Sequence, residues 1–175
     1  MIKHSTNSRP TTGHQFSVST LDEINGVVAS VSRAAEASYE AALNLAVKGD
    51  LEGATAALHR AVALDPGLVK AWLELADWAE HFDESEHAAC YCNHVLELDP
   101  HNPDALQGLA VALHNLSRNA AALEVLERFN RLHNADGRNR PETFKLQVEL
   151  MTLIGTQSGV NFTERVSSAT AVMEI

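Results

Sequence analysis

Two histidines and a cysteine are the residues whose types and spacing most suggest chemistry. His87, Cys90 and His94 are three and four residues apart. On a helix this spacing places them on one face, where imidazole and thiolate groups could hold a zinc ion. Glu84 and His87 also form half of a di-iron motif, but no second copy follows. The alternative is that these residues are solvated side chains on an outer helix face.

The motifs of familiar catalytic sites are absent from the sequence. It contains no His-Glu-x-x-His, no phosphate loop, no Gly-x-Ser-x-Gly and no paired Cys-x-x-Cys. Cys90 and Cys92 are one residue apart, so on a helix their side chains point in different directions and cannot form a disulfide. Free thiols favour a reducing compartment. We therefore expect a protein that is not an enzyme and has no cofactor.

Composition and charge favour a helical protein and a partner with a basic or mixed-charge surface. The 175 residues are 45% hydrophobic and 5% aromatic, and they carry a formal net charge of -10. Binding to nucleic acid through bulk charge is therefore disfavoured. No segment has the length of apolar sequence that a signal peptide or a membrane span requires. We expect a cytoplasmic protein without membrane insertion.

Turn signals divide the chain into helices. Residues 1–19 are polar and predict a disordered arm, after which Thr20 and Glu23 form a capping-box pattern at a helix start. One helix or two consecutive helices are expected from there to Gly49, and a flexible polar tail is expected over 156–175. The spacing of apolar residues and of Gly, Asp and Pro predicts further helices over about 51–64, 69–81, 84–98, 103–116, 119–133 and 141–154.

A repeat of 34 residues organises these helices. Ala-Leu-Asp-Pro at 63–66 recurs as Glu-Leu-Asp-Pro at 97–100. This period and its pattern of small and large residues resemble the tetratricopeptide repeat (TPR) family. The signature positions hold Ser38, Ala41, Ala42, Leu45, Ala54, Leu58, Ala61 and Pro66, then Trp72, Leu75, Ala76, Ala79, Ala88, Cys92, Val95 and Pro100, then Leu106, Leu109, Ala110, Leu113, Ala122, Leu126, Phe129 and Asn134.

The resemblance implies an all-α fold, a right-handed α-solenoid of stacked helix-turn-helix units. It implies an N-terminal helical extension over 20–34, three repeats over 35–134 (35–68, 69–102 and 103–134) and a capping helix over 141–154. Ser38 and Asn134 depart from the family pattern at the two ends, where atypical repeats are expected. The register also places His87, Cys90 and His94 at positions that are not packed, which favours the outer-face interpretation over a metal site.

In this family the first helix of each repeat lines a concave groove that binds partners. Carried over by position, the groove would be acidic with an apolar floor, and would suit a peptide or helix with basic and apolar residues. The alternative is that the acids only solvate helix faces. The implied residues are Glu36, Tyr39, Glu40, Leu43, Lys70, Leu73, Glu74, Asp77, Glu80, Asp104, Gln107, Val111 and His114. Repeats that bind chaperone C-termini use several basic residues, whereas here only Lys70 is of that kind.

The leading hypothesis is a scaffold or adaptor that binds another protein. A second hypothesis is a type III secretion chaperone for translocator proteins, a class that the chain resembles in size, acidity, N-terminal extension and repeat number. A third is a non-catalytic accessory module of an enzyme complex.

An apolar stripe precedes the repeats. Leu21, Ile24, Val28, Val31 and Ala35 follow one another at spacings of three and four residues, close to a heptad seam. The stripe could pack on the first repeat, or it could form a homodimer through residues 21–35. The sequence leaves both open.

Overall fold

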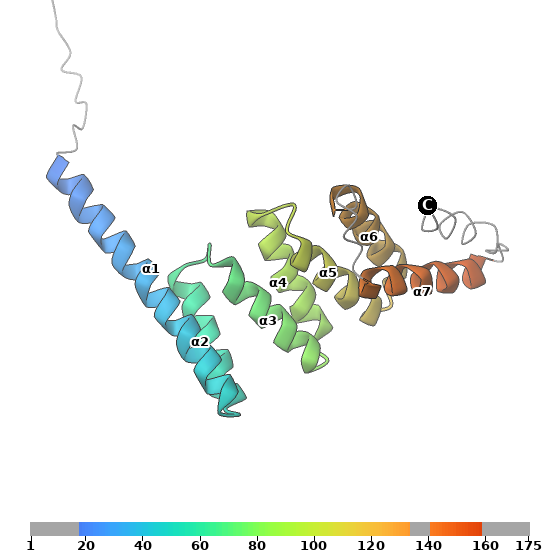
Figure 1. Ribbon diagram of the computed structural model, residues 1–175, viewed down its shortest axis with the longest axis horizontal. Coiled ribbons are helices and arrows are strands. Elements are labelled where there is room, and N and C mark those ends of the chain that lie inside the picture. Colours follow the sequence, from blue (N-terminus) through green and yellow to red (C-terminus); the bar gives the residue numbers. More distant parts are fainter. Residues whose placement is uncertain (1–17, 134–140, 159–175) are drawn as a thin grey trace, which may run out of the picture.

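Seven helices make up the part of the chain that the structure, a computed structural model, describes, which is residues 18–133 and 141–158 (Figure 1). Their bounds are α1 Val18–Val47, α2 Leu51–Leu64, α3 Val69–His81, α4 Ser85–Leu98, α5 Pro103–Asn115, α6 Asn119–His133 and α7 Pro141–Ser158. These described residues include no strand, which agrees with the predicted all-α helical repeat fold. None of their helices is long and apolar enough to cross a membrane.

The helices stack as consecutive pairs. Figure 1 shows α1 with α2, α3 with α4 and α5 with α6 arranged side by side in chain order, with α7 at the far end. The N-terminal half of α1 projects beyond α2, away from the other helices. The first helices of the pairs, α1, α3 and α5, are the elements that position the candidate site.

The turn inside each pair has the same backbone conformation. Gly49, Asp83 and Ser117 have φ of 81°, 60° and 60°. They are 34 residues apart, so the sequence period is also a period of the backbone. In each turn the next N–H donates back to a carbonyl five residues earlier, such as Asp50 to Leu45 at 3.0 Å and Arg118 to Leu113 at 2.8 Å. These bonds satisfy carbonyls that the helix end would leave unpaired.

Capping side chains set two of the helix starts. The Asp50 carboxylate accepts from the N–H of Gly53 at 3.0 Å, and the Asn102 side chain accepts from the N–H of Ala105 at 3.0 Å. Pro103 occupies the first turn of α5, where its missing N–H costs nothing. Local sequence therefore determines where α2 and α5 begin.

Small side chains let the paired helices approach closely. The alanines at two signature positions of the repeat are almost completely buried, and they are Ala42, Ala76 and Ala110 on the first helices and Ala54, Ala88 and Ala122 on the second. Larger side chains, among them Leu58, Leu106, Leu126 and Phe129, fill the space between pairs.

Trp72 joins the first two repeats, because its ring packs on both of their cores and its Nε1 donates to the Pro66 carbonyl at 2.9 Å.

The last helix covers the end of the array. Leu146 and the fully buried Leu150 of α7 pack with Ala110, Ala122 and Leu126. The side chains of Asn130 and Gln147 are hydrogen-bonded at 2.8 Å.

Some element bounds differ from the predictions. α1 begins at Val18 and runs without a break through the predicted extension and the first repeat helix, so Thr20 lies inside the helix and does not cap it. α7 continues through Gly155 to Ser158, four residues beyond its predicted end, because Gly155 is buried within the helix rather than placed in a terminating turn. Most of the predicted arm and tail, as well as Asn134, lies outside the described residues.

The first repeat lacks a predecessor, and this changes the environment of one signature residue. Ala41 is exposed, whereas the equivalent Leu75 and Leu109 are buried. This position packs against the preceding repeat, which α1 does not have. A small residue there avoids leaving a large apolar side chain in water.

We predict opposite effects for two Gly→Ala substitutions in neighbouring elements. Gly49→Ala should lower the free energy of unfolding by roughly 1–2 kcal/mol, because an alanine at positive φ is strained. Gly26→Ala, within α1 and with no atom close to the added methyl, should be neutral or stabilising by up to about 1 kcal/mol. Chemical denaturation followed by circular dichroism measures both, and destabilisation of similar size in the two variants would contradict the argument.

Candidate functional site

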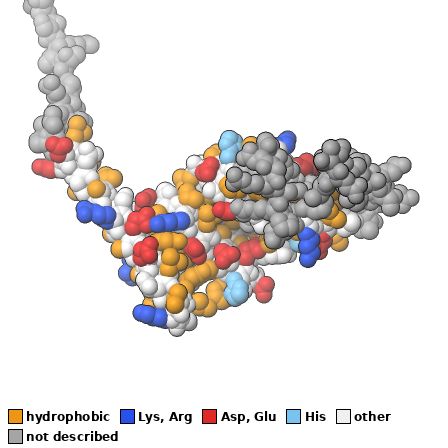
Figure 2. Space-filling view, in the orientation of Figure 1, with side chains coloured by type: hydrophobic (Ala, Val, Ile, Leu, Met, Phe, Trp, Pro, Cys, Tyr) orange, Lys and Arg blue, Asp and Glu red, His pale blue; other side chains and the backbone are white. Residues whose placement is uncertain are grey.

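A groove of about 510 Å³ crosses the face formed by the first helices of the three pairs. Side chains of α3 form its centre, α5 forms one wall, and Tyr39 of α1 lies at the opposite end. The lining residues are Tyr39, Lys70, Leu73, Glu74, Ala76, Asp77, Glu80, Cys92, Asp104, Gln107, Gly108 and Val111. Figure 2 shows acidic side chains gathered with apolar ones over the middle of the array.

The basic residue of this lining is already paired. Lys70 forms an ion pair with Glu36 of α1, and its Nζ lies over the ring of Tyr39, 4.5 Å from the centroid. The hydrogen bond to Glu36 raises the pKa of Lys70. Its charge is therefore balanced within the chain and does not offset the acids farther along the groove.

Three carboxyl groups on α3 share the centre of the groove. Burial raises the pKa of Glu74 and of Glu80, and the charge of Asp77, which lies between them in the sequence, raises both further. One carboxyl oxygen of Glu80 is buried and has no hydrogen-bond partner. The fold thus holds Glu74 and Glu80 in an environment that disfavours their charged forms.

The floor of the groove depends on a close approach between α4 and α5. A methyl group at Gly108 would lie 2.9 Å from Sγ of Cys92, so glycine permits the two helices to approach. Burial, and to a smaller extent the charge of Glu80, raises the pKa of the Cys92 thiol to about 12. The thiol is therefore protonated at neutral pH and acts as an apolar floor rather than as a nucleophile.

The structure brings nine of the predicted groove residues together in this lining, and they are Tyr39, Lys70, Leu73, Glu74, Asp77, Glu80, Asp104, Gln107 and Val111. Glu36 borders the groove through its ion pair with Lys70. Glu40, Leu43 and His114 are not part of the lining. Ala76, Cys92 and Gly108 also line the groove but were not predicted. Ala76 and Cys92 are packing positions of the repeat, and Gly108 is at neither a packing nor a groove position.

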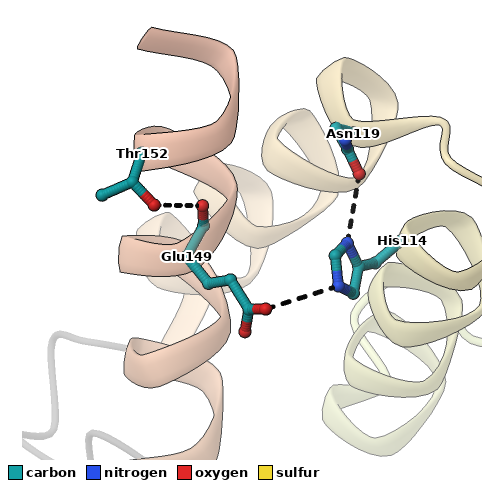
Figure 3. Close-up of polar contacts among 4 residues, drawn as sticks. All are labelled: His114, Asn119, Glu149 and Thr152. Carbon is teal, nitrogen blue, oxygen red and sulfur yellow. Dashed lines mark hydrogen bonds and ion pairs between the residues drawn. The ribbon is translucent and has the colours of Figure 1, made fainter. Parts of the chain in front are cut away.

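His114 makes contacts within the chain that tie the capping helix to the array. Its Nδ1 is 3.1 Å from Oδ1 of Asn119, at the start of α6, and its Nε2 is 3.9 Å from Oε1 of Glu149 on α7 (Figure 3). The Thr152 hydroxyl donates to the Glu149 carbonyl at 2.7 Å. The imidazole is only a quarter exposed and lies between three helices. Its position indicates a structural role at the third repeat.

The histidine–cysteine cluster on α4 lies beside a second hollow of about 480 Å³, which Cys90 and His94 help to line. His87 pairs with Glu84, with Nδ1 and Oε2 3.2 Å apart. His94 is not the solvated residue that the repeat register predicted, because its ring packs 4.3 Å from that of Trp72. Among residues 18–133 and 141–158, no three His, Cys, Asp or Glu side chains are placed to hold a metal ion.

Comparison with known families identifies one unit of the repeat. Residues 91–124 match the family model described as tetratricopeptide repeat. This segment runs from α4 through α5 into α6 and spans one full period of 34 residues. No curated protein sequence matches the chain.

Solved structures share the fold over most of their length. The first TPR of Spaghetti (RPAP3), bound to the HSP90 peptide SRMEEVD, is 17% identical, and the alignment covers 71% of this chain and 95% of that chain with a TM-score of 0.64. The first TPR domain of human RPAP3 is 16% identical, with 73% and 98% covered and a TM-score of 0.63. The TPR2B domain of yeast Sti1, in complex with pHsp70, is 20% identical, with 69% and 98% covered and a TM-score of 0.62. At these identities the likeness establishes the fold alone.

We predict that Glu80→Gln stabilises the fold at neutral pH. The folded state holds the Glu80 proton more tightly than the unfolded chain does, so the wild-type carboxyl lowers the free energy of unfolding as the pH rises through its raised pKa. The variant should have the higher melting temperature at pH 7, and the difference should shrink towards pH 4. Glu124→Gln, at an exposed position on α6, is the matched control and should change little at either pH. A lower melting temperature for Glu80→Gln at pH 7 would show that the carboxylate is stabilised in the fold.

Proposed function

Because this chain contains a tetratricopeptide repeat and has the TPR fold, we propose that it is a protein-interaction scaffold whose groove binds a segment of a partner. The segment is extended or helical and carries Lys or Arg together with an apolar side chain. The observation that carries this proposal is the lining of the groove, where Glu74, Asp77 and Glu80 stand beside Leu73 and other apolar residues. The role is binding, and it requires no reaction by the chain.

Charge supports a basic ligand. The ionised forms of Glu74 and Glu80 are disfavoured by burial and by Asp77, and Lys70 is engaged by Glu36. A guanidinium or ammonium group from a partner would supply the missing positive charge beside these carboxyl groups. Complementary charge of this kind would also increase the rate of association.

Apolar surface supports an anchor beside the basic residue. Leu73, Ala76 and Val111 line the groove together with the protonated thiol of Cys92. A side chain of the partner that covers this floor would remove apolar area from water, at about 25 cal/mol per Å². The apolar contact would contribute affinity, and the acids would select against segments of the wrong charge.

The same reasoning argues against transferring the ligands of the structural neighbours. The peptide bound to the first TPR of Spaghetti, SRMEEVD, contains two glutamates and an aspartate. In this chain such a peptide would face Asp77 and its neighbours, and the like charges would repel. The shared fold thus supports the mode of binding, while the lining residues support a different ligand chemistry.

We predict that the groove distinguishes peptides by charge. The probe is a panel of synthetic peptides that share one apolar frame and differ only in carrying Lys and Arg or Asp and Glu. The wild-type chain should prefer the basic set, with affinity that falls as salt increases. Asp77→Lys should weaken binding of the basic set by about tenfold or more.

Glu124→Lys, which makes the same charge change on the outer side of α6, is the control and should leave binding nearly unchanged. Fluorescence anisotropy measures both affinities. Equal binding of basic and acidic peptides, or equal loss in the two variants, would contradict the proposal.

A further inference from the structure

The projecting part of α1 exposes a row of large apolar side chains. Leu21 is 50% exposed, Ile24 48%, Val27 62%, Val28 58% and Val31 37%. The sequence left open whether the stripe from Leu21 to Ala35 packs on the first repeat. In the structure Ala35 does, whereas the five residues above stay exposed, and these five are the stripe meant below. Figure 2 shows apolar side chains along the projecting helix. Five such residues within three helical turns form a contiguous patch, which exposed helices of monomeric proteins seldom display.

The stripe continues the interface between α1 and α2. On the helix, Leu21, Ile24 and Val31 lie on the same face as Ala35 and Ala42, which are completely buried in the first repeat. The partner helix α2 ends at Leu64, and the chain then turns into α3. The apolar face of α1 therefore extends beyond the helix that covers its C-terminal half.

We propose that a second copy of the chain covers this stripe, with the two projecting helices paired antiparallel. Residues 21–31 of each copy would pack against residues 21–31 of the other. The second copy would thus continue the contact that α2 makes with the C-terminal half of α1. One stripe can supply both surfaces of such a contact, because a two-fold axis pairs a patch with itself. Burying the exposed apolar area of both copies would remove on the order of 1,000 Å² from water, which is the range of small, reversible interfaces.

The charges on α1 permit this pairing. The stripe itself is uncharged. On the helix Asp22 and Arg33 lie on the side opposite to it, and Glu23 lies at its edge, next to Val27. Each chain carries a formal net charge of -10. An antiparallel pair places the acidic repeat arrays at opposite ends of the paired helices, whereas a parallel pair would bring them side by side, where they repel. Antiparallel helices also have opposed macrodipoles.

The chain's own terminal segments are poorer candidates for this role. Residues 1–17 include only Met1, Ile2 and Phe16 as large apolar residues, too few to cover five. The residues after α7 follow a helix at the other end of the array (Figure 1). In either case the stripe would be covered within one chain, and the protein would be monomeric.

The first test measures mass in solution by sedimentation equilibrium over a range of concentrations. The wild-type chain should approach twice its 18.9 kDa as concentration increases. The double substitution Ile24→Asp with Val28→Asp should remain monomeric. The control, Asn25→Asp with Ala29→Asp, places the same two charges one residue farther along on exposed positions outside the stripe, and should still dimerise. Circular dichroism checks that all three retain their helix content.

A monomeric wild-type chain at every concentration would overturn the proposal, and so would a dimer that the Ile24 and Val28 substitutions leave intact. The peptide-binding measurement above tests the groove independently, because it does not depend on the oligomeric state.

The second test determines the orientation by disulfide trapping in a Cys90→Ser background. Val28→Cys should cross-link two chains, because the two copies of this residue meet near the two-fold axis. Leu21→Cys should not cross-link, because pairing residues 21–31 antiparallel puts the two-fold axis near residue 26 and separates the two copies of Leu21 by roughly 15 Å along the helices, beyond disulfide reach. Efficient cross-linking at position 21 would overturn the antiparallel arrangement.

Discussion

The architecture depends on close contact between paired helices, which alanine makes possible at two positions of every repeat. Ala42, Ala76 and Ala110 face Ala54, Ala88 and Ala122 across the pairs, and all are almost fully buried. A larger residue at any of these positions would separate the helices and change how the next pair stacks. Close pairing leaves the larger side chains to fill the spaces between repeats. It also aligns α1, α3 and α5, so that their remaining faces form one surface.

The candidate site is a consequence of this alignment, and its carboxyl groups lower the stability of the fold. Because α3 lies between two other first helices, Glu74 and Glu80 are partly removed from water, and Lys70, the basic residue of the groove lining, is paired with Glu36 instead of with them. A fold selected for stability alone would place neutral residues there. The unfavourable environment is consistent with a site that a partner completes, in the way that binding sites often retain destabilising groups.

The sequence predicted the periodic part of the molecule well and the parts that depend on tertiary context less well. Pro66 and Pro100 define the register, and from it most of the groove lining followed, because side chains one repeat apart occupy equivalent places. The register could not show that Cys92 and Gly108 form the groove floor, since that depends on how closely α4 and α5 approach. Nor could it show that His94 packs on Trp72, or that His114 contacts α7 through Glu149. Helical periodicity identified the apolar stripe of α1, but not that α2 is too short to cover it.

The cores of the repeats are joined by shared aromatic and aliphatic side chains. Trp72 and Tyr91 pack on both the first and the second core, and Leu113 and Val125 pack on both the second core and the one beneath α7. Loss of one repeat would therefore expose residues on which its neighbour depends. In a nearest-neighbour description of repeat proteins, the free energy of the interface between adjacent repeats is then large compared with the stability of each repeat alone. The array should melt as one cooperative body, with a single transition rather than successive losses of individual helix pairs.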